Sequence, residues 1–106
     1  MTFGVAVSSS GVFRDRADRR FERFRRTGDP RDLAAVFDST AAELWRVAAH
    51  LCRNAHDAED AVQNTFLAAI EGRSEWDAER PLLPWLLGLL VNRVREQHRR
   101  NARSID

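Results

Sequence analysis

A chain of 106 residues is long enough for one small domain with its own core and too short for two. Hydrophobic residues make up 43% of it, yet no apolar run reaches the roughly 20 residues of a membrane span, and the N-terminus lacks the features of a secretory signal. The net charge is +1, and the one cysteine, Cys52, excludes an internal disulfide. We therefore expect a soluble, cytoplasmic, single-domain protein.

The near-neutral net charge conceals oppositely charged segments. Residues 57–79 hold one arginine and seven acidic residues, whereas residues 80–106 hold six arginines and two acidic residues. Residues 1–30 are also basic, with seven arginines against four acids. An acidic middle beside a basic end favours two surfaces for different partners, and the basic one suits a phosphate backbone.

The N-terminal part is predicted to be a tail followed by a short helix. Residues 1–12 are small, polar and aperiodic, which is typical of a disordered tail. From Phe13, apolar residues recur at helical spacing up to a stop at Thr27-Gly28, with arginines and acids between them. We expect an aromatic stripe facing the core and an arginine-rich face toward solvent.

Two longer helices follow. Asp29-Pro30 fits an N-cap and a first-turn proline, and the helix that it opens is expected to run to about Arg53, uninterrupted by Asp38-Ser39-Thr40. Its predicted core stripe is Leu33, Val36, Phe37, Ala41, Leu44, Val47, Ala48 and Leu51. Asp57 is the expected cap of the next helix, which ends near Gly72, and residues 73–80 form a charged loop containing Trp76.

A last helix is expected from between Pro81 and Pro84 to about Ala102. Its predicted core face is Leu83, Leu86, Leu87, Leu90, Val91 and Val94. No stretch alternates as a strand would. The predicted fold class is all-α, with three long packed helices and a short N-terminal one.

The third helix carries a compact polar patch, formed by Asp57, Glu59, Asp60, Gln63 and Asn64. Residues three and four apart are neighbours on a helix, so Asp60, Gln63 and Asn64 lie within one turn. The patch is either an ordinary solvated face or a docking surface for a basic partner helix, to which the amides would give directional hydrogen bonds.

The face of the last helix opposite its core is unusual because it combines Trp85 and Leu89 with Asn92, Glu96 and Arg99. Stacking on unpaired bases and contacting base edges needs an aromatic ring and an amide, although Trp85 could equally make a packing contact. Further arginines follow that would hold phosphates, or complement the helix dipole, namely Arg93, Arg95, Arg99, Arg100 and Arg103.

Motifs for catalysis are missing from the sequence, which has no glycine-rich phosphate loop, no G-x-S-x-G and no pair of helical metal-binding histidines. His50, Cys52 and His56 lie close in sequence, but a structural zinc site needs four ligands with paired spacings. We expect no enzymatic activity, no metal and no cofactor.

Two segments together resemble region 2 of the sigma-70 family, and its extracytoplasmic-function (ECF) group most of all. They are DAEDAVQNTFLAAI and PWLLGLLVNRVREQHRR. The residues that match the family's usual pattern are Asp57 to Asp60, Gln63, Phe66, Pro84 to Leu86, Asn92, Arg99 and Arg100. The resemblance covers roughly residues 31–103, whereas residues 1–30 match only loosely. It implies a helical domain, residues 13–103, that docks on core RNA polymerase and melts the promoter −10 element in transcription initiation.

The resemblance also implies partners and site residues. The clamp helices of the polymerase beta-prime subunit would contact Asp57, Asp60, Gln63 and Asn64, where Asn64 replaces the usual glutamate. The loop before the last helix would capture a flipped base of the single-stranded non-template strand, with Trp85 near the fork and Asn92 near that base. The DNA-binding residues so implied are Trp76, Arg80, Trp85, Asn92, Arg93, Arg95, Arg99 and Arg100.

Sigma factors of this group carry a second, helix-turn-helix domain that reads the −35 element. This sequence stops at Asp106, so we interpret residues 104–106 as the start of a linker. The second domain is then absent from this sequence, which is either part of a longer protein or a single-domain relative. A helical interaction module for a regulatory partner such as an anti-sigma factor remains the alternative. A duplex-DNA reader is less favoured because no short turn joins two compact helices.

Overall fold

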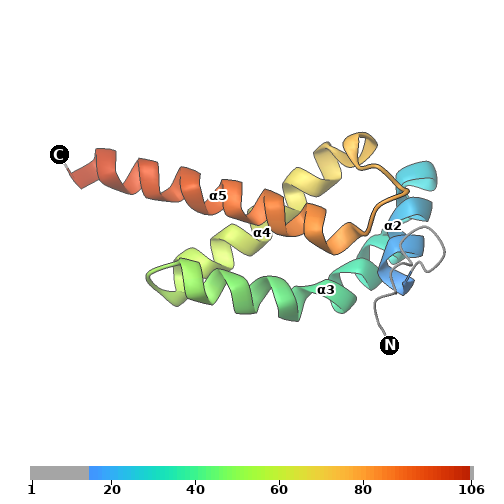
Figure 1. The fold of residues 1–106 in the computed structure, drawn as a ribbon, viewed down its shortest axis with the longest axis horizontal. Coiled ribbons are helices and arrows are strands. Elements are labelled where there is room, and N and C mark those ends of the chain that lie inside the picture. The colour runs from blue at the N-terminus through green and yellow to red at the C-terminus, as the bar shows by residue number, and fades with distance from the viewer. Residues whose placement is uncertain (1–14, 106) are drawn as a thin grey trace, which may run out of the picture.

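The computed structural model describes residues 15–105, with side chains up to Arg103. They form α2 (Arg16–Thr27), α3 (Pro30–Leu51), α4 (Ala55–Glu71), the short 3-10 helix η1 (Arg73–Glu75) and α5 (Leu82–Ile105) (Figure 1). No strand occurs in this part of the chain, so the predicted all-α class is confirmed. The predicted tail, residues 1–12, and Phe13 lie outside the described residues.

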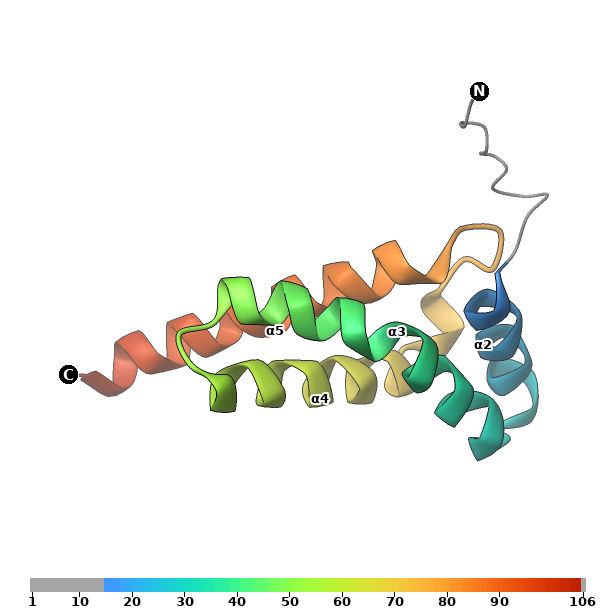
Figure 2. The same cartoon turned by 90° about the horizontal axis from the view of Figure 1, so that it is seen from below.

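Of the three long helices, α4 runs antiparallel to α3, and α5 runs antiparallel to α4. Helix α2 packs across one end of them (Figure 2). The short connection between α3 and α4, residues 52–54, makes these two helices fold back on each other, and the longer loop that contains η1 returns the chain along α4 as α5. Helix α2 contacts the N-terminal half of α3 and the start of α5. Both views show the last turns of α5 projecting beyond the other helices.

Four helix ends were predicted correctly because their signals are local. Gly28 takes a left-handed conformation, φ 74°, where its N–H satisfies the carbonyl of Phe24. Asp29 accepts a hydrogen bond from the N–H of Arg31, with Pro30 in the first turn. Helix α3 is continuous, as expected, and within it the hydroxyls of Ser39 and Thr40 donate to carbonyls one turn back.

Four helix boundaries differ from the prediction. Helix α2 begins at Arg16, with Asp15 as its extended N-cap, three residues later than the expected start at Phe13. Asn54, not Asp57, caps α4, because the Oδ1 of Asn54 accepts the N–H of Asp57 over 2.8 Å. The Asp57 carboxylate instead lies in the first turn of α4, where the helix dipole stabilises its negative charge. Helix α3 ends at Leu51, two residues earlier than expected, and α5 continues to Ile105, beyond the expected end at Ala102.

The core lies where α2, α3, α4 and α5 meet. Its largest fully buried apolar side chains are Trp76, Phe21, Leu44, Leu82, Leu86, Leu90, Val36 and Val62. On α5 the most buried stripe is Leu82, Leu86, Leu90 and Val94, so the predicted Leu83, Leu87 and Val91 are half-buried on its flanks. Phe37 and Leu51 were predicted to be core but are 44% and 40% exposed. Within residues 15–105, none of the helices is long and apolar enough to cross a membrane.

Candidate functional site

The outer face of α4 gathers the predicted docking residues. Asp57, Asp60 and Asn64 follow each other at spacings of three and four, which places them on one face, and Gln63 lies beside them. Asn64 donates to Asp60 from 3.4 Å, and Gln63 donates to Glu59 from 3.4 Å. These long hydrogen bonds within the helix leave carboxylate and amide groups available to a partner.

Sequence reasoning missed one residue of this face, Leu67, which is 56% exposed. It lies four residues after Gln63 and three after Asn64, so it extends the polar patch by one turn. This face therefore carries an exposed apolar group beside its carboxylate and amide groups. The signal for it was present in the sequence, because Leu67 is the large apolar residue of this helix that does not fit the core stripe.

The outward face of α5 forms a shallow hollow of about 610 Å³. Its lining residues are Pro84, Trp85, Gly88, Leu89, Val91, Asn92 and Arg95. Asn92 and Arg95 are exposed, whereas Trp85 is half-buried because its ring packs on Phe21 of α2, with centroids 5.9 Å apart. Trp85 therefore makes the packing contact that was one of its two predicted roles. It also lines the surface hollow, where part of its ring is exposed.

A second pocket, of about 470 Å³, adjoins this hollow at the loop between α4 and α5. It is lined by Glu75, Trp76, Asp77, Arg80, Pro81, Pro84 and Trp85, so Pro84 and Trp85 belong to both. The loop is closed by a turn in which the N–H of Arg80 donates to the carbonyl of Asp77 over 2.9 Å. The pocket at the loop and the hollow on α5 are therefore neighbours that meet at Pro84 and Trp85.

Trp76 does not have the exposed position that a base-stacking residue needs. It is 2% exposed, and its ring meets that of Phe21 edge-on at 5.4 Å. Because stacking requires a free π-face, the expectation of direct DNA contact by Trp76 is corrected to a role as a wall of the pocket. Arg80 is exposed, with its Nε 3.6 Å from Asp77.

The arginines of α5 divide into two kinds. Arg95, Arg99, Arg100 and Arg103 are exposed. Arg93 is turned toward the helix surface, where its Nη2 lies 3.3 Å from Glu96 and its Nε is buried. Arg93 is therefore less available to a phosphate than the other predicted DNA-binding arginines.

The chain matches the family described as Sigma-70 region 2 over residues 36–104, which is well over half of its length. It belongs to the sigma-70 region 2 family. It is 39% identical over 72 residues to the ECF RNA polymerase sigma factor SigL of Mycobacterium tuberculosis, which covers 67% of this chain and 40% of that protein. It is 32% identical over 83 residues to the RNA polymerase sigma factor CarQ of Myxococcus xanthus, covering 76% of this chain and 47% of CarQ.

These comparisons confirm the prediction of an ECF-type sigma region 2. The chain spans less than half of the length of the curated relatives it matches. No solved structure gives a significant match. The family match includes the α4 patch and the whole face of α5, whereas α2 lies outside it.

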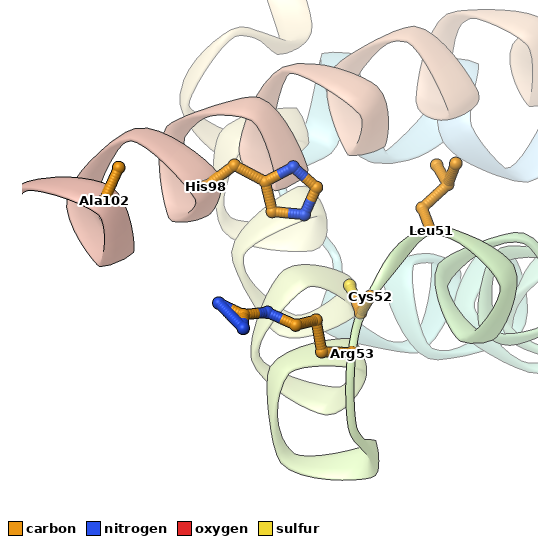
Figure 3. A pocket seen from close by; sticks show the side chains of 5 residues that line it. All are labelled: Leu51, Cys52, Arg53, His98 and Ala102. Atoms are coloured by element: carbon orange, nitrogen blue, oxygen red, sulfur yellow. The ribbon is translucent and has the colours of Figure 1, made fainter. Parts of the chain in front are cut away.

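This region 2 domain also has a surface pocket far from the loop, of about 370 Å³, between the end of α3 and α5 (Figure 3). Leu51, Cys52, Arg53, His98 and Ala102 line it. The Sγ of Cys52 donates to Oε1 of Gln97 over 3.7 Å. Burial raises the pKa of the Cys52 thiol, and the negative charge of Asp57 adds to the increase.

Neither His50 nor His56 lines that pocket. Across residues 15–105, no three or more His, Cys, Asp and Glu side chains are grouped as a metal ion would need.

Proposed function

We propose that this chain is region 2 of an ECF sigma factor, which docks on core RNA polymerase and recognises and melts the promoter −10 element in transcription initiation. The sigma factor would act in the cytoplasm as a binding protein without catalytic activity. The observation that carries the proposal is the pair of surfaces within the family match. One is the acidic and amide face of α4, and the other consists of the pocket at the loop and the neighbouring hollow on α5.

The α4 face supports docking on the clamp helices of the beta-prime subunit. Asp57, Asp60, Gln63 and Asn64 offer acceptors and amides on one helix face, and Leu67 adds an exposed apolar group one turn further along. Protein interfaces combine an apolar contact, which gives affinity, with directional polar groups, which give specificity.

The hollow supports binding of single-stranded non-template DNA. Extruding a base costs a few kcal/mol, which stacking on an aromatic ring, at roughly 1–3 kcal/mol, and an enclosing pocket can offset. Trp85 supplies the half-exposed ring, Asn92 supplies a donor and an acceptor, and Arg95 and Arg99 supply positive charge for the backbone.

A regulatory partner is a second candidate for the protein-binding surface. Phe37 and Trp45 of α3 are 44% and 36% exposed, and Phe37 packs on Phe66 of α4 with ring centroids 4.9 Å apart. Exposed aromatic residues on α3 favour binding of a protein partner such as an anti-sigma factor.

The test is fluorescence anisotropy of labelled oligonucleotides with the chain alone and with core polymerase. The oligonucleotides are single-stranded non-template −10 pools and the matched duplexes. We expect sequence-selective binding of the single strand that core polymerase strengthens. Polymerase binding without DNA selectivity would leave only a docking module, and binding of neither would refute the proposal.

A further inference from the structure

One face of α2 contacts both ends of the loop that connects α4 to α5. Asp18, Phe21 and Arg25 lie three and four residues apart, so they share that face. Their partners are Trp76 at the start of the loop and Leu82 at its end.

The start of the loop is held by Arg25. Its Nη1 donates to the backbone carbonyl of Trp76 over 2.8 Å, and its guanidinium carbon lies 5.7 Å from the centre of the Trp76 ring. The Nη2 of the same arginine donates to Glu22 over 2.8 Å, which fixes the direction of the guanidinium plane. The loop therefore leaves η1 at a position set by α2.

The end of the loop is held by Asp18. Its Oδ1 accepts the N–H of Leu82, the first residue of α5, over 2.9 Å. Such first-turn N–H groups have no partner within their own helix, and a carboxylate there is favoured by the helix dipole. Asp18 is 7% exposed and thus acts as a buried cap for α5, supplied by a helix far away in the sequence.

Between these two contacts lies Phe21, which is fully buried. Its ring meets Trp76 at 5.4 Å and Trp85 at 5.9 Å, measured between centroids. Trp76 and Trp85 are two of the walls of the pocket of about 470 Å³. The ring of Phe21 therefore lies against both tryptophans and sets the distance between them.

We propose that α2 is a positioning helix for this loop. Asp18 and Arg25 fix its two ends, Phe21 spaces the two tryptophans, and together they preorganise the pocket for an unpaired base. The proposal rests on the proposed function for the identity of the ligand, and it assigns a role to a helix that lies outside the family match. A preorganised pocket loses less conformational entropy on binding, so disturbing α2 should weaken DNA selectivity without any lost DNA contact.

The test compares Arg25→Ala and Asp18→Ala with a matched control, Arg26→Ala. The Arg26→Ala substitution removes the same charge from the same helix as Arg25→Ala does. Arg26 differs in being exposed, with Glu22 as a partner at 3.9 Å. Asp18→Asn is the conservative variant, because it keeps an oxygen that can accept from Leu82. Each variant is first checked for a cooperative thermal transition, and its affinity for core polymerase is measured.

Two readouts follow. The first is amide hydrogen exchange of residues 73–83 without DNA, in which we expect Asp18→Ala to accelerate exchange at Leu82 about tenfold or more and Asp18→Asn to restore most of the protection. The second is anisotropy with the single-stranded −10 pools in the presence of core polymerase. Here Arg25→Ala and Asp18→Ala should lose about tenfold in selectivity at unchanged polymerase affinity, whereas Arg26→Ala should match the wild type.

The two readouts separate the possible failures. Unchanged exchange at Leu82 in Asp18→Ala, or faster exchange with full DNA selectivity in both variants, would overturn the positioning role while the proposed function stands. If the wild type itself does not select single-stranded DNA, the proposed function fails. The exchange readout then still decides whether α2 holds the loop.

Discussion

Arg20 donates a hydrogen bond from its Nε to Oδ1 of Asp32 over 2.6 Å, which ties α2 to the first turn of α3. Asp32 is 1% exposed, and Arg23 approaches the same oxygen at 3.5 Å. Arg20 also donates to the carbonyl of Arg31 over 3.3 Å. Some arginines of α2 therefore point into the molecule, which corrects the expectation of a wholly solvated basic face.

We predict that Arg20→Ala lowers the free energy of unfolding by about 2–3 kcal/mol, because it leaves a buried carboxylate without its closest partner. This expected loss of stability is smaller than the loss for a fully buried ion pair, because the Arg20 side chain is 25% exposed. Urea denaturation measures the change. Arg31→Ala is the control, as its ion pair with Asp29 lies on the surface and its loss should leave the midpoint in place. Equal effects of the two substitutions would argue against the inward role of Arg20.

For the α4 face, we predict that Asp60→Ala combined with Gln63→Ala weakens binding to core polymerase at least tenfold, and that Leu67→Ala weakens it further. All three side chains point away from the domain core, so its thermal stability should change little. A titration with labelled core polymerase measures the affinity. Glu43→Ala removes a charge from α3, where Glu43 pairs with Arg46, and should have no effect. Full affinity in the triple variant would exclude this face as the docking surface.

The sequence predicted those features of the fold that are set locally. Gly28, Asp29-Pro30 and Gly72 marked helix ends correctly, because each acts on backbone groups within one turn. The cap of α4 was missed although it is local. Two good capping residues stand three apart there, and only the geometry shows that the Asn54 side chain reaches the N–H of Asp57.

The remaining errors depend on contacts between distant segments. Trp76 lies in a charged loop whose sequence predicts exposure, but Phe21 and Arg25 of α2 bury it. Trp85 was placed on the outward face by helical periodicity, which cannot register that α2 covers part of that face. Helical periodicity thus predicted that Trp85, Leu89 and Asn92, which line the hollow on α5, share a face, but it gave no sign of the α2 contacts to the neighbouring loop.

We predict slow alkylation of Cys52 by iodoacetamide. Burial, and then the charge of Asp57, raise the pKa of its thiol, so at pH 8 the folded chain should react several-fold more slowly than the urea-unfolded chain. The raised pKa disfavours the thiolate only in the folded state. The free energy of unfolding should therefore be unaffected at neutral pH, and it should decrease as the pH rises through the pKa of the unfolded thiol, about 8.5. Asp57→Asn should speed the reaction, and mass spectrometry follows it. Equal rates in folded and unfolded chains would contradict this account.

The exposed arginines of α5 should contribute to DNA affinity through the phosphate backbone. We predict that Arg95→Ala and Arg99→Ala each reduce the slope of log affinity against log salt by about 0.7 for single-stranded DNA, with similar losses on every sequence. Arg93→Ala should reduce it less, since Arg93 is half-buried beside Glu96. Anisotropy titrations at several salt concentrations give the slopes. An unchanged slope in the Arg95 and Arg99 variants would place the DNA elsewhere.

Asn92 should supply selectivity and not stability. Its side chain is exposed at the edge of the hollow on α5, so Asn92→Ala should shift the free energy of unfolding by less than about 0.5 kcal/mol. Loss of a donor and an acceptor beside a captured base should reduce the preference for −10 sequence over random single strands by about tenfold. Both quantities are measured on the same sample, by thermal unfolding and by anisotropy with core polymerase.

The matched control for Asn92 is Asn101→Ala, which makes the same chemical change half a turn around α5 and two turns nearer its end. It should leave selectivity intact. If Asn92→Ala instead lowers the melting temperature strongly, its side chain stabilises the fold and the placement on the DNA surface is wrong. If both substitutions reduce selectivity equally, the effect comes from α5 as a whole, and base recognition must be assigned to the loop pocket between Trp76 and Trp85 alone.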